Sequence, residues 1–191
     1  MNQPLISPEQ LQQRLLEEDN IVILDASIEF QIPSESEKIK GQMIPSAIRF
    51  DYDKDFCNKH TLLPHMFPSE KHFNTRAREI GINQDSTVVV YDNSGTFASP
   101  RAWWMFMAMG HNNVYILDGG LPAWIKAGYA TETDYRTEVK AGNFEGQIQD
   151  NHFVNAQQIQ NYSDDKSANI LDARSQARFD SEVPEPREGL R

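Results

Sequence analysis

Short apolar runs separated by helical patterns dominate the first two thirds of the chain. Residues 21–26 (IVILDA), 86–92 (STVVVYD) and 114–120 (VYILDGG) are runs of strand length that are rich in aliphatic and β-branched side chains. Such runs are typical of strands buried on both faces of a parallel sheet. The pattern therefore predicts an α/β fold in which helices cover a parallel sheet.

The stretches between these runs have the periodicity and the end signals of helices. Ser7 and Ser69 each precede a polar stretch with one apolar face, and serine is a favoured N-cap residue. Residues 100–110 form a very apolar helical stretch that ends at a glycine, and residues 121–129 form a shorter one. Residues 43–53 (MIPSAIRFDYD) resume the apolar pattern after a polar loop.

An internal repeat is the clearest long-range pattern. Residues 22–30 read VILDASIEF and residues 169–179 read NILDARSQARF, and Asp25 corresponds to Asp172. A glutamine-rich helical stretch precedes each copy. Four identical letters can recur by chance, but the matching helix in front of both copies favours a domain duplication.

The repeat predicts the domain organisation. Residues 1–134 are expected to form one complete domain, and the polar residues 135–152 a linker. Residues 153–191 then form the beginning of a second domain, in which residues 170–173 are expected to be a buried strand.

The composition narrows the classes of partner. The 191 residues carry a formal net charge of −10, which argues against binding to the backbone of nucleic acids. No apolar run approaches the ~20 residues that span a bilayer, and the N-terminus lacks the features of a signal peptide, so no membrane partner is expected. The single cysteine, Cys57, excludes an internal disulfide and favours a reducing, cytoplasmic location.

The loop that joins the strand at residues 86–92 to the next helix is a candidate anion site. Its sequence, DNSGTFAS, combines glycine with small hydroxyl residues at the carboxyl end of a strand, where open α/β sheets place their ligands. The loop contains no cysteine, and Ser94 and Ser99 have no obvious base. A purely structural turn is the alternative.

Cys57 is a second candidate. Lys59 and nearby histidines would favour a thiolate, whereas Asp53 and its neighbouring aspartates oppose one, so the residue is either a nucleophile or an inert packing residue. The five histidines lack metal-ligand spacing, and neither a metal nor a cofactor is expected. His65 is either a structural or a functional histidine, and His111, after Gly110, is expected at the surface.

Arginines gather just after the second copy of the repeat, where the first copy has none. Guanidinium groups suit the bidentate recognition of small carboxylates or sulfur oxyanions. Surface ion pairs with the neighbouring glutamates are the alternative. The arginines are Arg174, Arg178, Arg187 and Arg191.

Motifs along nearly the whole chain resemble the tandem-domain sulfurtransferases, the family of rhodanese and 3-mercaptopyruvate sulfurtransferase. The stretches that carry the resemblance are VILDAS, IPSAIRFD, PHMFPSE, VVVYDNSGTFASPRAWWMFMAMGH, VYILDGGLPAWIKAGY and ILDARSQARFDSEVPEPREGLR. The resemblance implies a rhodanese-like parallel sheet flanked by helices, with one complete, catalytically silent domain and the beginning of a second. The persulfide-forming cysteine of such enzymes lies further along the second domain, and Asp92 stands at the equivalent place in the first.

The resemblance also implies roles for individual residues. Asp53 and His65 match first-domain residues of the active site, which relay a proton or orient the substrate, and Arg178 and Arg187 match arginines that bind the donor anion. The partners implied are a small-molecule sulfur donor, a thiol or cyanide acceptor, and the second rhodanese domain packed against the first. The expected function is transfer of a sulfane sulfur from 3-mercaptopyruvate or thiosulfate, with the 191 residues alone inactive. A non-catalytic interaction or regulatory module is the alternative.

Overall fold

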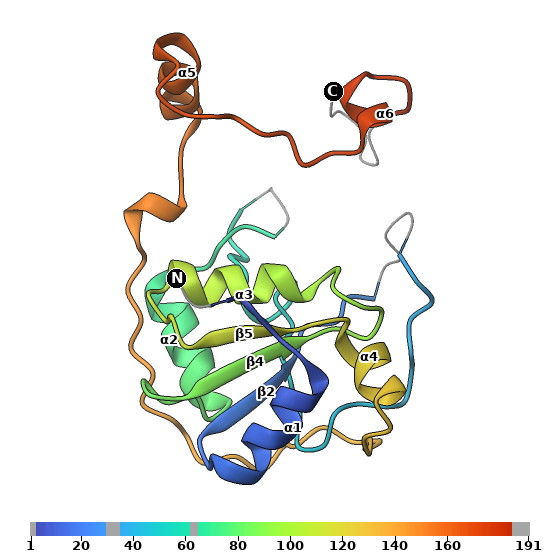
Figure 1. Cartoon of the computed structure of the whole chain (residues 1–191). Coiled ribbons are helices and arrows are strands. Elements are labelled where there is room, and N and C mark those ends of the chain that lie inside the picture. Colours follow the sequence, from blue (N-terminus) through green and yellow to red (C-terminus); the bar gives the residue numbers. More distant parts are fainter. Residues whose placement is uncertain (1–2, 30–34, 62–64, 185–191) are drawn as a thin grey trace. The chain divides into compact units, whose positions relative to one another are not determined.

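The computed structural model describes residues 3–29, 35–61 and 65–184 of the chain (Figure 1). The chain divides into two compact units, the first from Met1 to Gln149 and the second from Asp150 to Arg191.

A parallel sheet of five strands forms the centre of the first unit, as the apolar runs predict. The central strands are buried along most of their length because helices cover both faces of the sheet. β2 and β4 pair in register from Ile21 and Thr87 to Asp25 and Tyr91. The strand order is β1 (Leu5–Ile6), β5 (Val114–Leu117), β4 (Thr87–Tyr91), β2 (Ile21–Asp25) and β3 (Ile48–Arg49).

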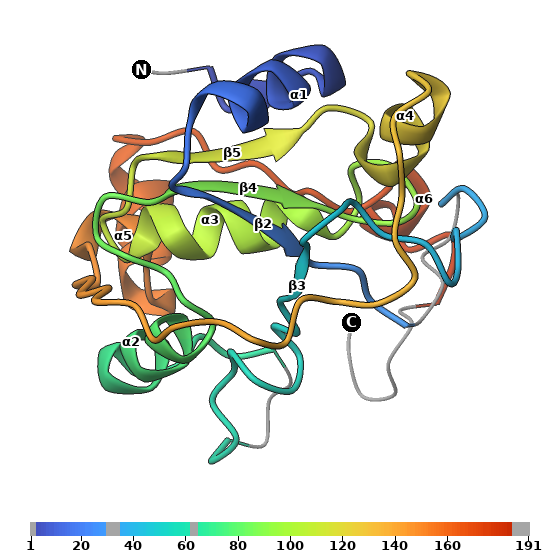
Figure 2. The same ribbon diagram turned by 90° about the horizontal axis from the view of Figure 1, so that it is seen from below.

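Two helices lie on each face of this sheet, which gives three layers (Figure 2). α1 (Pro8–Glu17) and α4 (Gly120–Lys126) cover one face. α2 (Glu70–Glu79) and α3 (Ser99–Ala108) cover the other. The expected α/β class with a helix-flanked parallel sheet is therefore confirmed, and β1, only two residues long, is an edge strand that the sequence pattern does not predict.

Alternate residues of each strand supply two separate cores. Val88 and Val90 belong to the core under α2 and α3, whereas Val89 and Tyr91 belong to the core under α1 and α4. This alternation follows from the period of two along a strand.

The predicted N-caps are present. Ser7 Oγ accepts a hydrogen bond from the backbone N of Gln10 at 3.2 Å, and the Gln10 side chain accepts one from Ser7 N at 2.9 Å. Ser69 Oγ accepts from His72 N at 3.3 Å. At the start of each helix, one free backbone amide is thus satisfied by the serine that the sequence indicates.

The segment from Tyr135 to Gln149 packs along the first unit as an extended strap. Its Phe144 is fully buried, and Phe144 N donates to Ile82 O at 3.1 Å. A side chain at Gly142 would lie 2.0 Å from Ile82 O, so the two backbones are in direct contact there. The first unit therefore extends to Gln149, beyond the residue 134 expected from composition, because backbone hydrogen bonds anchor a polar segment that lacks helical or strand periodicity.

His111 is buried, which corrects the expectation that it lies at the surface. Its side chain is 4% exposed, its Nε2 lies 3.0 Å from Ser86 O, and its ring packs against Phe106 and Phe144. Gly110 (φ +78°) ends the helical region and turns the next residue back into the core. Burial lowers the pKa of His111, against the opposing effect of its hydrogen bonds to the backbone.

The second unit contains a 3₁₀ turn at Asp150–His152, α5 (Ala156–Asp165) and the short α6 (Gln176–Phe179). The strand expected at residues 170–173 is not formed, and Leu171 is 90% exposed. A strand is stabilised by hydrogen bonds to neighbouring strands, and the described part of this unit contains no other strand to pair with it. The expectation of a buried strand there is therefore wrong for this chain.

Candidate functional site at the carboxyl edge of the sheet

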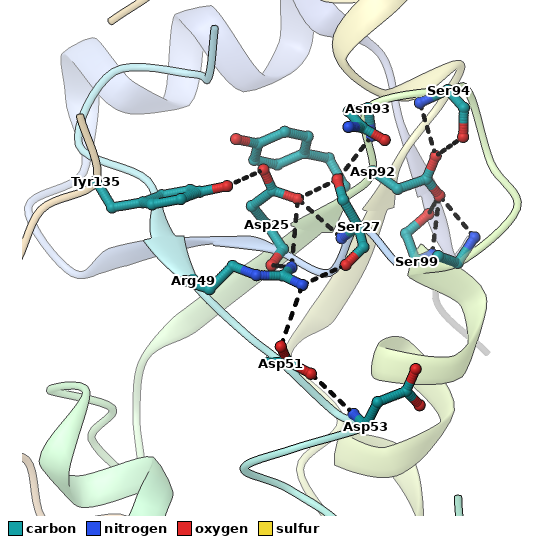
Figure 3. A network of polar contacts seen from close by, with 12 residues as sticks. Asp25, Ser27, Arg49, Asp51, Asp53, Asp92, Asn93, Ser94, Ser99 and Tyr135 are labelled. Atoms are coloured by element: carbon teal, nitrogen blue, oxygen red, sulfur yellow. Dashed lines mark hydrogen bonds and ion pairs between the residues drawn. The ribbon is translucent and has the colours of Figure 1, made fainter. Parts of the chain in front are cut away.

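Polar side chains meet where β2, β3 and β4 end (Figure 3). Asp25 is the last residue of β2, Arg49 the last of β3, and Asp92 directly follows β4. Because the strands are parallel, their carboxyl ends lie at one edge of the sheet, the place where open α/β sheets bind ligands.

The carboxylate of Asp92 fills the amide cradle formed by residues 97–99 at the start of α3. Asp92 Oδ2 accepts hydrogen bonds from the backbone N of Phe97 at 3.0 Å, of Ala98 at 2.9 Å and of Ser99 at 2.9 Å. Ser99 Oγ donates to the same oxygen at 2.8 Å. The N-cap residue of α3, Ala98, makes no side-chain cap, so Asp92 takes over this role from the strand end.

The start of α4 covers the amide cradle that the Asp92 carboxylate occupies. Asp92 is fully buried, and its backbone O accepts from Leu121 N at 2.9 Å. A side chain at Gly120 would lie 2.2 Å from Gly95 O and 2.5 Å from Asp92 O, so the start of α4 lies directly on the loop. The loop thus has the amide geometry of an anion site, but the anion is one of its own side chains.

Asp25 organises the neighbouring part of the edge. Its Oδ1 accepts from Ser27 N at 2.8 Å, and its Oδ2 accepts from Tyr135 Oη at 2.9 Å. Arg49 Nη1 donates to Asp25 O at 2.9 Å, and Ser27 Oγ accepts from Asn93 N at 2.9 Å. Burial, and then the Asp25 carboxylate, raise the pKa of Tyr135, so this phenol donates and stays neutral. These hydrogen bonds connect the loop after β2, the loop after β4 and the extended strap that begins at Tyr135.

Asp53 and His65 are in direct contact, from two segments twelve residues apart. His65 Nδ1 is hydrogen-bonded to Asp53 Oδ1, and both side chains are partly exposed. The backbone N of Asp53 donates to Asp51 Oδ1 at 3.1 Å, which holds the pair at the end of β3. In the tautomer that carries its hydrogen on Nδ1, His65 donates to the Asp53 carboxyl group, and its Nε2 has no hydrogen.

Cys57 lacks the surroundings of a nucleophile. Its Sγ donates to Asp53 O at 2.9 Å, and the residue is buried. Burial raises the pKa of the thiol, and three aspartates add to this rise, whereas Lys59 opposes it. The packing role that the sequence leaves open is the one that these contacts support.

Arg101 is a residue of this edge that sequence reasoning did not single out. Its Nη2 donates to the backbone O of His65 at 2.8 Å, and its guanidinium carbon lies 4.9 Å from the centre of the Trp104 ring. The sequence feature that could have indicated Arg101 is that it is the one charged residue in an apolar helical stretch, PRAWWMFMAM.

The expected anion-binding arginines belong to the other unit. Arg178 lies in α6, where its backbone N donates to Ser175 O at 3.0 Å. Arg187 lies outside the described residues. Arg174 forms an ion pair with Asp172 at 2.7 Å. The roles expected for Arg178, Arg187, Asp53 and His65 stay predictions.

No group of three or more His, Cys, Asp or Glu side chains among the described residues is placed to hold a metal ion. None of the helices in the same part of the chain is both long and apolar enough to cross a membrane.

A three-layer α/β domain with a strand-to-helix anion cradle at the carboxyl edge of a parallel sheet defines the class of this protein. The family model of the rhodanese-like domain matches residues 7–127. The chain therefore belongs to the rhodanese-like family.

Its relatives and structural neighbours are consistent with this assignment. The chain is 35% identical to thiosulfate/3-mercaptopyruvate sulfurtransferase 1, mitochondrial, of Arabidopsis thaliana, over 100% of this chain and 55% of that protein. It is 40% identical to 3-mercaptopyruvate sulfurtransferase of Escherichia coli (strain K12), over 78% of this chain and 52% of that protein. The chain thus spans about half the length of these curated relatives.

Solved structures agree in fold. The crystal structure of SseA from Escherichia coli, described as a 3-mercaptopyruvate sulfotransferase, superimposes with a TM-score of 0.83 at 31% identity, covering 98% of this chain and 72% of that chain. The crystal structure of Tum1 from Saccharomyces cerevisiae gives a TM-score of 0.80 at 29% identity, covering 96% and 64%.

Proposed function

We propose that this chain is the first domain and the beginning of the second domain of a sulfurtransferase. The protein would move a sulfane sulfur from 3-mercaptopyruvate, or from thiosulfate, to a thiol or cyanide acceptor. The names of its relatives support sulfur transfer as the reaction class. The persulfide-forming cysteine belongs, in this proposal, to the second domain and is not among the 191 residues.

The contact between His65 and Asp53 is the observation that carries a catalytic role for the first unit. The pair lies at the ligand-binding edge, partly exposed, with His65 Nε2 available for a proton. In this proposal, the Asp92 carboxylate keeps a sulfur anion out of the amide cradle of the first unit. A cradle already occupied by a buried carboxylate excludes a second negative charge.

The proposed chemistry has two steps. A cysteine thiolate attacks the sulfur of 3-mercaptopyruvate, an S–S bond forms, and the C–S bond breaks to leave the enolate of pyruvate, which takes up a proton. An acceptor thiolate then attacks the outer sulfur and releases the cysteine thiolate. His65, oriented by Asp53, relays the proton, and Arg178 and Arg187 bind the donor carboxylate.

Kinetics of the full-length gene product test the role of the pair. His65→Gln is expected to lower kcat for 3-mercaptopyruvate about 100-fold, the usual contribution of a positioned acid–base group. His60→Gln is the matched control, because His60 is exposed in the same segment and its backbone N donates to the local Asn58 Oδ1 at 2.9 Å. Equal kcat values for wild type and His65→Gln would remove His65 from the mechanism.

The non-catalytic alternative is tested on the 191 residues themselves. Production of thiocyanate from cyanide is expected to be absent, because Cys57 is buried and its thiol pKa is raised. Activity that disappears in Cys57→Ser would make Cys57 the sulfur carrier and overturn the proposal. A full-length product that is itself inactive with both sulfur donors would favour an interaction or regulatory module.

The partners follow from the same proposal. They are a small-molecule sulfur donor, a thiol acceptor, and intramolecular packing against a complete second rhodanese domain. A cytoplasmic location stays a prediction; the Arabidopsis relative is named as mitochondrial.

A further inference from the structure

Arg101 connects the two parts of the candidate site in the first unit. It belongs to the first turn of α3, immediately after the cradle that Asp92 fills. Its side chain reaches the segment of His65, thirty-six positions earlier in the chain, and donates to the His65 carbonyl at 2.8 Å. A cation thus joins the helix of the cradle to the backbone of the proton-transferring residue.

The backbone of His65 needs such support. Its φ angle is +58°, in the left-handed region that residues with a Cβ rarely adopt. A conformation of this kind persists only where its surroundings hold it. The guanidinium of Arg101 holds the carbonyl of His65 through a charge-assisted hydrogen bond. From this conformation the ring reaches Asp53 through Nδ1.

The surroundings of Arg101 also place its charge near the pair. Burial lowers the pKa of Arg101, and the attraction of Tyr52 and Asp53 opposes that effect. Arg14 provides a contrast on the other face of the sheet. Its guanidinium lies at the same 4.9 Å from an aromatic ring, that of Tyr115, with a carboxylate of Glu18 at 3.9 Å. Arg14 thus stacks on an aromatic ring and pairs with a carboxylate, whereas Arg101 stacks on a ring and binds the carbonyl of His65.

We propose that Arg101 is a positioning residue. By holding the His65 carbonyl it fixes the orientation in which the imidazole donates through Nδ1 to Asp53, and so it keeps Nε2 as the proton-exchanging atom. The catalytic importance of the His65 orientation rests on the proposed function. The orientation itself can be tested by spectroscopy, without an activity assay.

The tautomer of His65 is the direct readout. Two-dimensional ¹H–¹⁵N spectra of the ¹⁵N-histidine-labelled chain, at about pH 9 where an ordinary imidazole is neutral, distinguish Nδ1–H from Nε2–H. Wild type is expected to show Nδ1–H. Arg101→Met is expected to shift the ratio about tenfold toward Nε2–H, as for the loss of one charge-assisted hydrogen bond.

Three further variants sharpen this test. Arg101→Lys keeps a cationic donor and is expected to retain most of the Nδ1–H form. Arg101→Gln keeps a polar side chain and is expected to shift the ratio in the same direction as Arg101→Met, which secures the test if the methionine variant does not fold. Arg14→Met removes the matched stacked arginine and is expected to leave the tautomer unchanged. An unaltered ratio in folded Arg101→Met or Arg101→Gln would overturn the positioning role.

Kinetics of the full-length product separate this inference from the proposed function. Arg101→Met is expected to lower kcat about tenfold with KM changed less than about twofold, since substrate binding is not its task. A changed tautomer with an unchanged kcat would keep the positioning role and contradict the proton transfer assigned to His65. A lowered kcat with an unchanged tautomer would overturn the positioning role.

Discussion

Two regions of the molecule repeat the same local structure in opposite surroundings. α1 and α5 are both ten residues long, and both begin with a capping box, built on Ser7 in one and Asn155 in the other. After each helix comes an aspartate whose Oδ1 accepts from the backbone N two residues later, at 2.8 Å for Asp25 and 2.9 Å for Asp172. The capping box and this bond from aspartate to backbone are thus present in both copies.

Burial is where the copies differ. Leu24 is 0% exposed, and its counterpart Leu171 is 90% exposed; Ile23 is 3% exposed, and Ile170 is 50% exposed. In the first copy, β4 pairs with β2 residue by residue, whereas the second copy has no such strand within the described residues. Caps and turns are therefore specified locally, and a strand is specified only together with its neighbours.

Truncation of the two equivalent leucines is the strongest test of this difference. Leu24→Ala is expected to lower the free energy of unfolding of the first unit by about 3 kcal/mol, because a cavity opens in a closed core. Leu171→Ala is expected to change it by less than about 0.5 kcal/mol. Urea unfolding followed by tryptophan fluorescence measures both, since all three tryptophans lie in the first unit. A similar loss in both variants would show that Leu171 is buried against folded structure.

Removal of the two equivalent caps is expected to have a smaller effect. Ser7→Ala should lower the same free energy of unfolding by about 1 kcal/mol, since α1 is part of the cooperative core. Asn155→Ala should leave that transition unchanged and speed hydrogen exchange of the α5 amides, because a short helix with few tertiary contacts is marginal. If Asn155→Ala also lowered the main transition, α5 would be part of the first unit's cooperative structure.

The smallest expected effect concerns the ion pair of the second copy. Hydrogen bonds from Arg174 hold the pKa of Asp172 below its usual value. The ion pair therefore stabilises the folded second unit at pH values above the ordinary pKa of aspartate. This stabilisation is lost as the pH falls through the lowered pKa of Asp172. Carboxyl ¹³C titration should show the pKa of Asp172 rising in Arg174→Ala.

Arg178→Ala is the matched control for this titration. Arg178 lowers the pKa of Asp172 through its charge and by less than Arg174 does through its hydrogen bonds. Its removal should therefore raise that pKa less than removal of Arg174 does. A larger rise in Arg178→Ala than in Arg174→Ala would show that the short-range pair is not the main cause.

Most of the fold could be predicted from the sequence because its central strands are continuous apolar runs and because α1 and α2 begin at serine caps. The errors occur where distant residues decide the outcome. His111 follows a helix-ending glycine, and it is buried because its ring packs against Phe106 and against Phe144 of the strap. Residues 170–173 have the composition of a strand but no strand to pair with in the described part of their unit.

The site could be predicted less completely. Asp53 and His65 were expected from a resemblance, because nothing in a separation of twelve residues requires their side chains to meet. The glycine and serines after β4 indicated an anion cradle, but sequence could not show that the carboxylate of Asp92 folds back onto three amides of its own loop. The bond from Arg101 to His65 depends on the packing of α3 and had no sequence signature beyond a lone cation.

The Asp92 cradle also has a consequence for competition among ligands. A carboxylate tethered within its own binding site is present there at an effective concentration of the order of millimolar or more, and it never diffuses away. Sulfate, thiosulfate or phosphate in solution would have to displace it against four hydrogen bonds to one oxygen. This cradle is therefore closed to small anions from solution as long as the Asp92 carboxylate stays in place.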